Sequence, residues 1–233
     1  MGLFGRTTTP VTAETALAGH LQRTYPVPAT HAVLKTPLEG PWPDGTEVLY
    51  VAMGCFWGAE RIFWRLPGVV TTAAGYMGGF SPNPTYEETC TGRTGHTEAV
   101  LVAYDPARTS PELLLKEFWE NHDPTTPNRQ GNDVGTQYRS AVYWTTPQQE
   151  AAVRATAETF GAELTRHRLG PVSTELRPAS EAGAFYYAEA YHQQYLFTNP
   201  NGYCNHGPNG LTCQVGVLAQ DRNVAQQDVL PAG

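Results

Sequence analysis

The chain has 233 residues, of which 15 are Lys or Arg and 22 are Asp or Glu, so its formal net charge is −7. A negative chain of this kind lacks the basic surface that follows nucleic-acid phosphates, and we expect no nucleic-acid partner. Charged residues make up 16% of the sequence, whereas 23 glycines and 19 prolines indicate a folded domain with many ordered loops rather than a disordered chain.

The sequence also bears on the cellular compartment. No segment approaches the roughly 18 apolar residues of a membrane helix, and the N-terminus lacks the apolar region of a signal peptide. Four cysteines are too few for a secreted scaffold held together by disulfides; they are instead buried and inert, bound to a metal, or redox-active. We therefore expect a cytoplasmic protein without membrane contact, and we take it to be a monomer.

The first 45 residues differ from the rest of the chain. They contain six prolines and little periodicity, apart from a short helix predicted near 13–21. We interpret residues 1–45 as an N-terminal extension that wraps around the core or precedes it.

The core begins with a strand followed by a helix. Residues 47–53 form an apolar run of strand length, which Gly54 ends. In residues 55–66 the apolar side chains recur at positions i, i+3, i+4 and i+7, which predicts an amphipathic helix. Cys55 therefore lies at the turn between the strand and the helix.

The later elements follow from similar patterns. Glycine, proline and asparagine predict a structured loop over GGFSPNPTYEETCTGRTG, and Ser110 followed by Pro111 predicts the start of a helix. The remaining predictions are strands at 69–76, 97–104, 138–145 and 172–176, helices at 111–121, 147–168 and 185–197, and coil from 198 to 233.

The order of these elements predicts the fold class. The series β-α-β-β-α-β, followed by α-β-α, is that of a split βαβ, ferredoxin-like core. We therefore expect an α+β protein, a two-layer α/β sandwich with long ordered loops and coil-rich terminal extensions. Its parts are the extension at 1–45, an α/β domain at 46–197 and a C-terminal tail at 198–233.

Cys55 is the first candidate for chemistry. A cysteine at a helix N-terminus faces unpaired backbone N–H groups and the positive end of the helix dipole, which lower its pKa and favour the reactive thiolate. The alternative is a small buried side chain without reactivity. Phe56 and Trp57 follow directly, and they either pack in the core or line a small apolar pocket beside the sulfur.

Seven blocks of the sequence form a pattern, namely GCFWGAE (Gly54–Glu60), GYMGG (Gly75–Gly79), NPTYEETC (Asn83–Cys90), TGHTEAV (Thr94–Val100), GNDVGTQYRS (Gly131–Ser140), YHQQYL (Tyr191–Leu196) and NPNGYC (Asn199–Cys204). In order, between about residues 48 and 216, these blocks resemble the motifs of the A-type peptide methionine sulfoxide reductase family. The resemblance implies an oxidoreductase that converts methionine S-sulfoxide, free or in proteins, to methionine, and so repairs proteins under oxidative stress. It implies that 46–197 is the catalytic domain, and that thioredoxin or a similar dithiol supplies the electrons without a bound cofactor.

The resemblance assigns Cys55 as the nucleophile on the sulfoxide sulfur and Glu98 as the acid that protonates the departing oxygen. Glu98 shares a strand face with Val100 and Val102, and desolvation on an apolar face raises the pKa of a carboxyl group. A glutamic acid that stays partly protonated near neutral pH is a competent general acid. The alternative is an ordinary carboxylate on a strand face.

Three further residues follow from the same motifs. Tyr86 and Tyr138 would donate hydrogen bonds to the sulfoxide oxygen, where negative charge develops, and Asp133 would help to hold the site. The alternative for each tyrosine is a half-buried ring with its hydroxyl group at the surface.

Two cysteines in the tail would recycle the nucleophile. After oxygen transfer Cys55 would be a sulfenic acid, which a second thiol must resolve. Cys204 lies in a Gly/Asn/Pro-rich segment suited to this approach, and Cys213 would pass the disulfide outward to the reductant. Cys90 is interpreted as structural.

Two other classes of protein remain open. Cys55, His96 and either Asp133 or Asn132 would make a cysteine hydrolase, although that reading leaves Glu98 without a role.

A binding module would instead hold its tail with zinc on Cys204, His206 and Cys213. These residues supply no fourth ligand for a tetrahedral site, and we expect no metal. The chain has no glycine-rich nucleotide-binding motif, so the electrons should come from thiols.

Overall fold

The computed structural model describes residues 11–215, so the first ten residues of the extension and residues 216–233 of the tail lie outside the described part. Its strands are β1 (Glu47–Met53), β2 (Val69–Met77), β3 (Thr97–Tyr104), β4 (Arg129–Gln130), β5 (Asp133–Val134), β6 (Ser140–Trp144), β7 (Glu175–Pro178) and β8 (Tyr186–Tyr187). Its helices are α1 (Phe56–Phe63), α2 (Tyr86–Cys90), α3 (Pro111–Glu120), α4 (Pro147–Arg166), α5 (Ala179–Ala182) and α6 (Tyr195–Thr198), with a 3-10 turn at Thr136–Tyr138.

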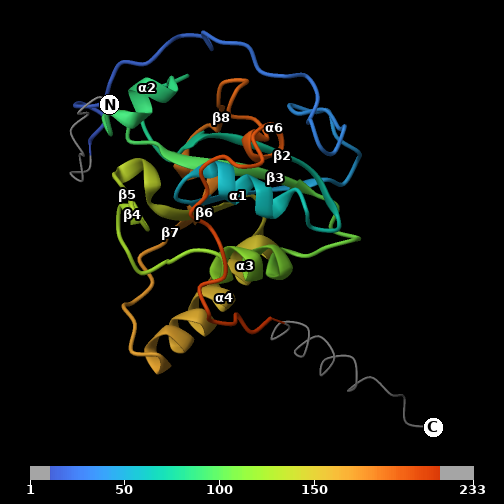
Figure 1. Ribbon diagram of the computed structural model, residues 1–233, viewed down its shortest axis with the longest axis vertical. Coiled ribbons are helices and arrows are strands. Elements are labelled where there is room, and N and C mark those ends of the chain that lie inside the picture. Colours follow the sequence, from blue (N-terminus) through green and yellow to red (C-terminus); the bar gives the residue numbers. More distant parts are fainter. Residues whose placement is uncertain (1–10, 216–233) are drawn as a thin grey trace.

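The described strands form a main sheet in the order β7-β6-β1-β3-β2-β8 and a separate pair, β4-β5 (Figure 1). Strands β1 and β2 both run antiparallel to β3, which lies between them, and β6 runs antiparallel to β1 on its other side. Strand β7 is parallel to β6. This arrangement is the predicted split βαβ core, extended by one strand at each edge, and it confirms the α+β fold class.

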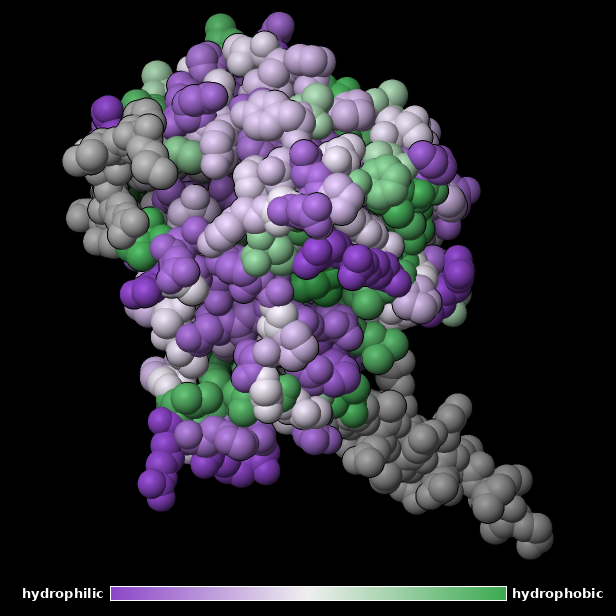
Figure 2. Space-filling model, in the orientation of Figure 1, coloured by the Kyte–Doolittle hydropathy of each residue, from purple (hydrophilic) through white to green (hydrophobic). Residues whose placement is uncertain are grey.

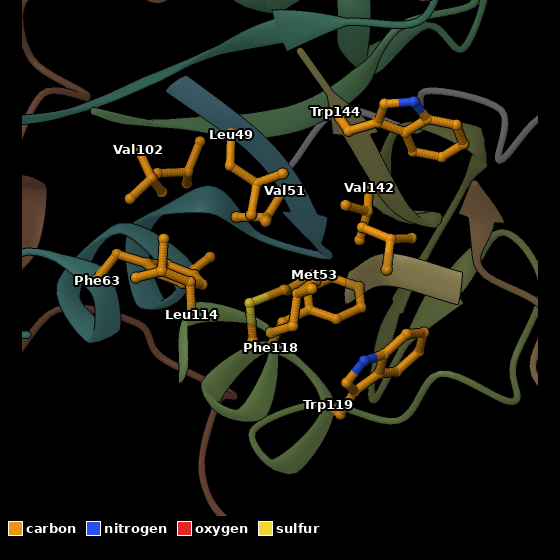
Figure 3. Close-up of a cluster of buried hydrophobic side chains, with 14 of the residues drawn as sticks. Leu49, Val51, Met53, Phe63, Val102, Leu114, Phe118, Trp119, Val142 and Trp144 are labelled. Carbon is orange, nitrogen blue, oxygen red and sulfur yellow. The ribbon is translucent and has the colours of Figure 1, made fainter. Parts of the chain in front are cut away.

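Helices α1, α3 and α4 cover one face of this sheet and bury the larger core. The Nε1 group of Trp119 on α3 donates a hydrogen bond of 3.0 Å to Thr156 Oγ1 on α4, which joins the two helices inside the core. Figure 3 shows part of this cluster, with Leu49, Val51 and Met53 from β1, Val102 from β3, Val142 and Trp144 from β6, Phe63 from α1, and Leu114, Phe118 and Trp119 from α3.

The N-terminal extension covers part of the opposite face. Leu38 is fully buried against Ala73, Leu101 and Ala103, which point away from the helices. Because both faces are covered, all eight residues of β3 are buried. The extension contains turns where a helix near 13–21 was predicted, so that prediction is wrong.

A buried chain of hydrogen bonds joins the extension to α1. His31 Nε2 lies 2.9 Å from Thr72 Oγ1, which donates to Glu60 Oε1 at 3.0 Å. Gln194 donates its backbone N–H to Glu60 Oε2 at 2.8 Å and its side-chain amide to Oε1 at 2.7 Å. These four residues are 0–1% exposed, so the extension, β2, α1 and the segment before α6 are held to one another.

Three other sequence predictions differ from the structure. The helix predicted at 185–197 is wrong: β8 pairs with β2, and Gln193 then accepts from Ala74 N–H and donates to Ala74 O, so a helix would forfeit both interactions. The predicted loop contains the short helix α2, which a capping box of Thr85 and Glu88 begins. The last predicted strand, at 172–176, lies three residues further on, as β7.

Beyond α6, the tail follows an irregular path past α1 and α3 (Figure 1). Asn209 holds it there, because its side-chain amide donates at 2.7 Å to the carbonyl groups of both Trp119 and His122. On the face drawn in Figure 2, hydrophobic and hydrophilic residues are intermixed. No helix within residues 11–215 combines the length and the apolar character needed to cross a membrane.

Candidate active site

A cavity of about 210 Å³ opens where the N-terminus of α1 meets β3, α2 and the segment around β5. It is lined by seven of the residues singled out in the sequence, together with Tyr203, which was not. The lining residues are Cys55, Phe56, Trp57, Tyr86, Glu98, Asp133, Tyr138 and Tyr203.

Cys55 and Glu98 meet at the start of α1. Cys55 is the residue before the first helical turn, with φ −54° and ψ 119°, and is 6% exposed. The backbone N–H of Phe56 donates a hydrogen bond of 2.9 Å to Glu98 Oε2. Glu98 lies on β3 and is 2% exposed. Its carboxyl group therefore accepts a hydrogen bond from one of the free N–H groups at the start of the helix, beside the thiol.

Burial dominates the protonation of both groups. Desolvation raises the pKa of Glu98 to about 8, and the Phe56 bond lowers it only in part, so the side chain is largely protonated at neutral pH, as predicted. Burial and then Glu98 raise the pKa of Cys55 well above its usual value, whereas the helix-dipole argument predicted a lower one. That prediction is wrong, because α1 is a short helix and the Cys55 side chain has too little contact with water to support a thiolate.

The two predicted tyrosines line the cavity from different elements. Tyr86 begins α2, and its backbone N–H donates at 2.8 Å to Glu189 Oε1. Tyr138 ends the 3-10 turn. Burial raises the pKa of both hydroxyl groups, so each remains a proton-bearing donor throughout the physiological range.

Asp133 connects the cavity to the tail. Its carboxylate accepts hydrogen bonds from the Tyr203 hydroxyl at 3.1 Å and from Asn205 Nδ2 at 2.8 Å. Burial raises the pKa of Asp133, although these two donors oppose the shift.

Sequence reasoning missed the residues that support the aromatic wall. Trp57 stacks on Tyr195 with ring centres 3.9 Å apart, and its Nε1–H donates to His192 Nδ1 at 3.0 Å. The ring of His192 also lies 4.5 Å from that of Tyr86. His192 and Tyr195 belong to the YHQQYL block, where the sequence predicted a continuous helix, and that prediction gave no sign of their place in the site.

The four cysteines are distributed unequally. Cys204 lies over α1, where its Sγ accepts a hydrogen bond of 3.0 Å from Arg61 Nη2. Cys213 is outside the cavity: it is 2% exposed in the helix-side core, burial raises its pKa to about 11, and its N–H donates to Glu120 Oε1 of α3 at 2.8 Å. Cys90 is half-buried at the end of α2, beside Tyr86.

The structure disfavours the alternatives. His96, required by a hydrolase, is buried in the loop before β3, where its Nδ1 accepts from Gly79 N–H and its Nε2 lies 2.8 Å from Ser81 O. Both nitrogens are therefore engaged in holding that loop. For the zinc-bound tail, Cys204 and Cys213 pack against different helices, and residues 11–215 contain no cluster of three or more His, Cys, Asp or Glu side chains placed to hold a metal ion.

Taken together, a thiol at a helix start, a proton-bearing carboxyl group beside it and a second thiol in an adjacent segment are suited to oxidation and reduction at sulfur. On this α+β framework, they define a thiol-dependent oxidoreductase.

Comparison with known proteins narrows this class. Residues 47–216 match the family model described as peptide methionine sulfoxide reductase. The peptide methionine sulfoxide reductase MsrA of Salinispora arenicola is 60% identical over 194 residues, which are 82% of this chain and 87% of that protein.

Two solved structures agree with this result. Methionine sulfoxide reductase A of Corynebacterium diphtheriae has a TM-score of 0.79 and 47% identity, over 89% of this chain and 99% of that one. Mxr1 of Saccharomyces cerevisiae in its reduced form has a TM-score of 0.62 and 32% identity, over 71% and 92% of the two chains. The chain belongs to the peptide methionine sulfoxide reductase family.

Proposed function

We propose that this protein reduces methionine S-sulfoxide to methionine, in proteins and as the free amino acid, with Cys55 as nucleophile and Glu98 as proton donor. The observation that carries the proposal is the protonated carboxyl group of Glu98 beside the Cys55 thiol in a cavity of about 210 Å³. This volume suits a small side chain, and the cavity lining matches a sulfoxide because it combines aromatic rings with hydroxyl groups.

Binding orients the sulfoxide before any bond changes. The apolar end of the substrate packs on Phe56 and Trp57, while the sulfoxide oxygen accepts hydrogen bonds from the hydroxyl groups of Tyr86 and Tyr138. Asp133 holds the Tyr203 side of the cavity through its bond to that hydroxyl.

The raised pKa values of Cys55 and Glu98 fit a single exchange of protons. Glu98 gives its proton to the sulfoxide oxygen, which makes the sulfur a better electrophile, and the resulting carboxylate takes the proton of the Cys55 thiol. The thiolate then attacks, and the oxygen passes to Cys55. Methionine leaves, and Cys55 remains as a sulfenic acid at the oxidation level that the substrate has lost.

The reaction must then return Cys55 to its thiol. Cys204 attacks the sulfenic acid, water leaves, and a disulfide forms; Cys213 passes that disulfide to thioredoxin or a similar dithiol. Thiols carry the two electrons throughout, so the scheme uses no bound cofactor. Such a cycle suits the reducing cytoplasm, where it would repair oxidised proteins.

Single-turnover chemistry tests the assignment. Reduced protein is mixed with each epimer of methionine sulfoxide separately, and methionine is measured. The S epimer should yield methionine, and Cys55→Ser should abolish that yield while circular dichroism stays unchanged. Cys90→Ser, which changes a thiol beside the same cavity, is the matched control and should keep the yield. Methionine formed by Cys55→Ser would refute the mechanism.

A further inference from the structure

Cys204 and His206 approach α1 over the same residue, Gly58. A Cβ atom added to Gly58 would lie 2.9 Å from Cys204 Sγ and 2.3 Å from His206 Nδ1. Gly58 is one helical turn beyond Cys55, and Arg61 is one turn further, so the three positions follow one another along neighbouring turns of α1. The absence of a side chain at Gly58 thus lets the tail lie directly on the helix beside the nucleophile.

Arg61 contacts the sulfur of Cys204. Its Nη2 donates to Sγ at 3.0 Å, and a guanidinium group is a donor that carries a positive charge and accepts nothing. A hydrogen bond of this kind holds one lone pair of the sulfur and stabilises negative charge on it. It therefore stabilises the charge that develops on this sulfur as it attacks another sulfur.

His206 holds the tail beside the same thiol, since its backbone carbonyl accepts from Cys204 Sγ at 3.8 Å. Its Nε2 lies 2.7 Å from the carbonyl oxygen of Met53, two residues before Cys55, so the proton is on Nε2 and the lone pair on Nδ1. Burial lowers the pKa of His206 to about 4, which keeps the ring neutral. Its Nδ1 is buried, faces Gly58 and has no hydrogen-bond partner among residues 11–215.

The neighbouring tail residues lock this arrangement. Asn205, between Cys204 and His206, donates to Gln130 O at 3.1 Å and to Asp133 Oδ2 at 2.8 Å. The tail thus contacts α1, the end of β1 and the β4-β5 pair through three consecutive residues. Fixing a reacting group in this way reduces the entropy that its reaction must overcome.

We infer that Arg61 and His206 prepare Cys204 for attack on oxidised Cys55: Arg61 stabilises the attacking sulfur, and His206 anchors the tail residue that carries it. The inference rests on the proposed function, in which Cys204 resolves the sulfenic acid. Arg61 contacts a reacting atom directly. His206 is a positioning residue, because the hydrogen bond from its Nε2 to Met53 O holds the tail in place.

The step balances in atoms and electrons. Cys204 Sγ attacks Cys55 Sγ, and the proton of the Cys204 thiol passes to the departing oxygen. The S–S bond forms as the S–O bond breaks, and the oxygen leaves as water. Cys204 is oxidised and the sulfenic sulfur of Cys55 is reduced.

The test separates oxygen transfer from resolution. Reduced protein reacts with one equivalent of methionine S-sulfoxide without reductant. Methionine release reports oxygen transfer, while dimedone trapping and mass spectrometry report the Cys55 sulfenic acid and the Cys55–Cys204 disulfide over time. In Arg61→Met, methionine release should stay within about twofold, whereas disulfide formation should slow by about 10- to 100-fold, the range for losing a hydrogen bond to a charged group.

Conservative variants show whether charge and anchoring are the cause. Arg61→Lys should recover part of the disulfide rate, and His206→Gln, which keeps a donor, should resolve faster than His206→Leu. Arg65→Met, an exposed arginine on the turn that follows α1, is the matched control and should behave as wild type.

Each result has one meaning. If the wild type releases no methionine, the proposed function fails. If the wild type forms the disulfide but Arg61→Met forms it at the same rate, the inference about Arg61 is overturned. Loss of methionine release in Arg61→Met would also overturn it, since the effect would then not be specific to resolution.

Discussion

At the scale of single residues, Glu98 shows how the fold sets the chemistry. The apolar strand face predicted a carboxyl group with a raised pKa, and burial on β3 raises it to about 8. The same burial acts on Cys55, where the local sequence suggested the opposite direction. A helix N-terminus can be read from the chain, whereas the water around it depends on the segments at 131–138 and 203–206, which lie far away in sequence.

We expect Glu98→Gln to slow oxygen transfer by about 10²- to 10⁴-fold, the usual contribution of a positioned acid. Glutamine keeps the shape and accepts the Phe56 bond but has no proton to give. In the wild type the acid form of Glu98 exists below its pKa, so the single-turnover rate should fall as pH rises through about 8. Quenched-flow measurement of methionine between pH 6 and 10 tests both statements.

The free energy of unfolding should also depend on pH through Glu98. Because folding raises the pKa of Glu98 from 4.5 to about 8, its contribution is complete below pH 4.5 and is lost as pH rises to about 8. Glu98→Gln removes this component, whereas Glu158→Gln, on the exposed side of α4, should not. For the preceding prediction on oxygen transfer, a single-turnover rate of Glu98→Gln within tenfold of the wild-type rate would contradict the role of Glu98 as the acid.

At the scale of elements, the first helix and its preceding strand were predictable, and the segment at 185–197 was not. Strand β1 is an apolar run of strand length and helix α1 shows helical periodicity, so local sequence predicts their type. The later segment has aromatic residues at spacings that also suit a helix. In the structure, Gln193 and Gln194 instead make long-range hydrogen bonds to Ala74 and Glu60. A local sequence pattern cannot indicate such interactions.

The tail sets a condition on the relay of thiols. Cys204 is beside α1, but Cys213 is buried against α3, held by the Glu120 bond and by Asn209 before it. A disulfide can pass from Cys204 to Cys213 only if this part of the tail leaves α3, as a segment without helix or strand can do. The interactions at 203–206 can persist while those at 209–213 break.

We therefore expect Cys213→Ser to form the Cys55–Cys204 disulfide normally but to lose most turnover with thioredoxin, while dithiothreitol still sustains it. The reason is access: a small dithiol reaches a half-buried disulfide, whereas a protein reductant needs an exposed one. Steady-state rates with the two reductants, together with disulfide mapping after one turnover, test this. Equal rates with thioredoxin for Cys213→Ser and the wild type would remove Cys213 from the pathway.

At the scale of the whole molecule, the chain encloses its sheet with helices on one face and with the proline-rich extension on part of the other. Sequence periodicity predicted the helical layer, because amphipathic helices show which side they bury. Sequence periodicity left open whether the extension wraps the core, because a segment without periodicity does not show which of its side chains are buried. We propose the division into residues 1–45, 46–197 and 198–233 as a description of chain segments, with residues 11–45 packed on the second segment as one unit.

If the extension is part of the folded unit, a single buried side chain in it should matter as much as one in the core. Leu38, in the extension, is 0% exposed against the sheet, whereas Leu21, in the same extension, is 100% exposed. We expect Leu38→Ala to lower the free energy of unfolding by about 2–5 kcal/mol, the range for a buried leucine, and Leu21→Ala to change it by less than about 0.5 kcal/mol. Urea denaturation followed by fluorescence and circular dichroism measures both. A coincident single transition shifted by Leu38→Ala shows that the extension unfolds with the sheet. A Leu38→Ala protein as stable as Leu21→Ala would mean that the extension adds nothing to the cooperative unit, because a cavity left beside Ala73 and Leu101 must otherwise cost free energy.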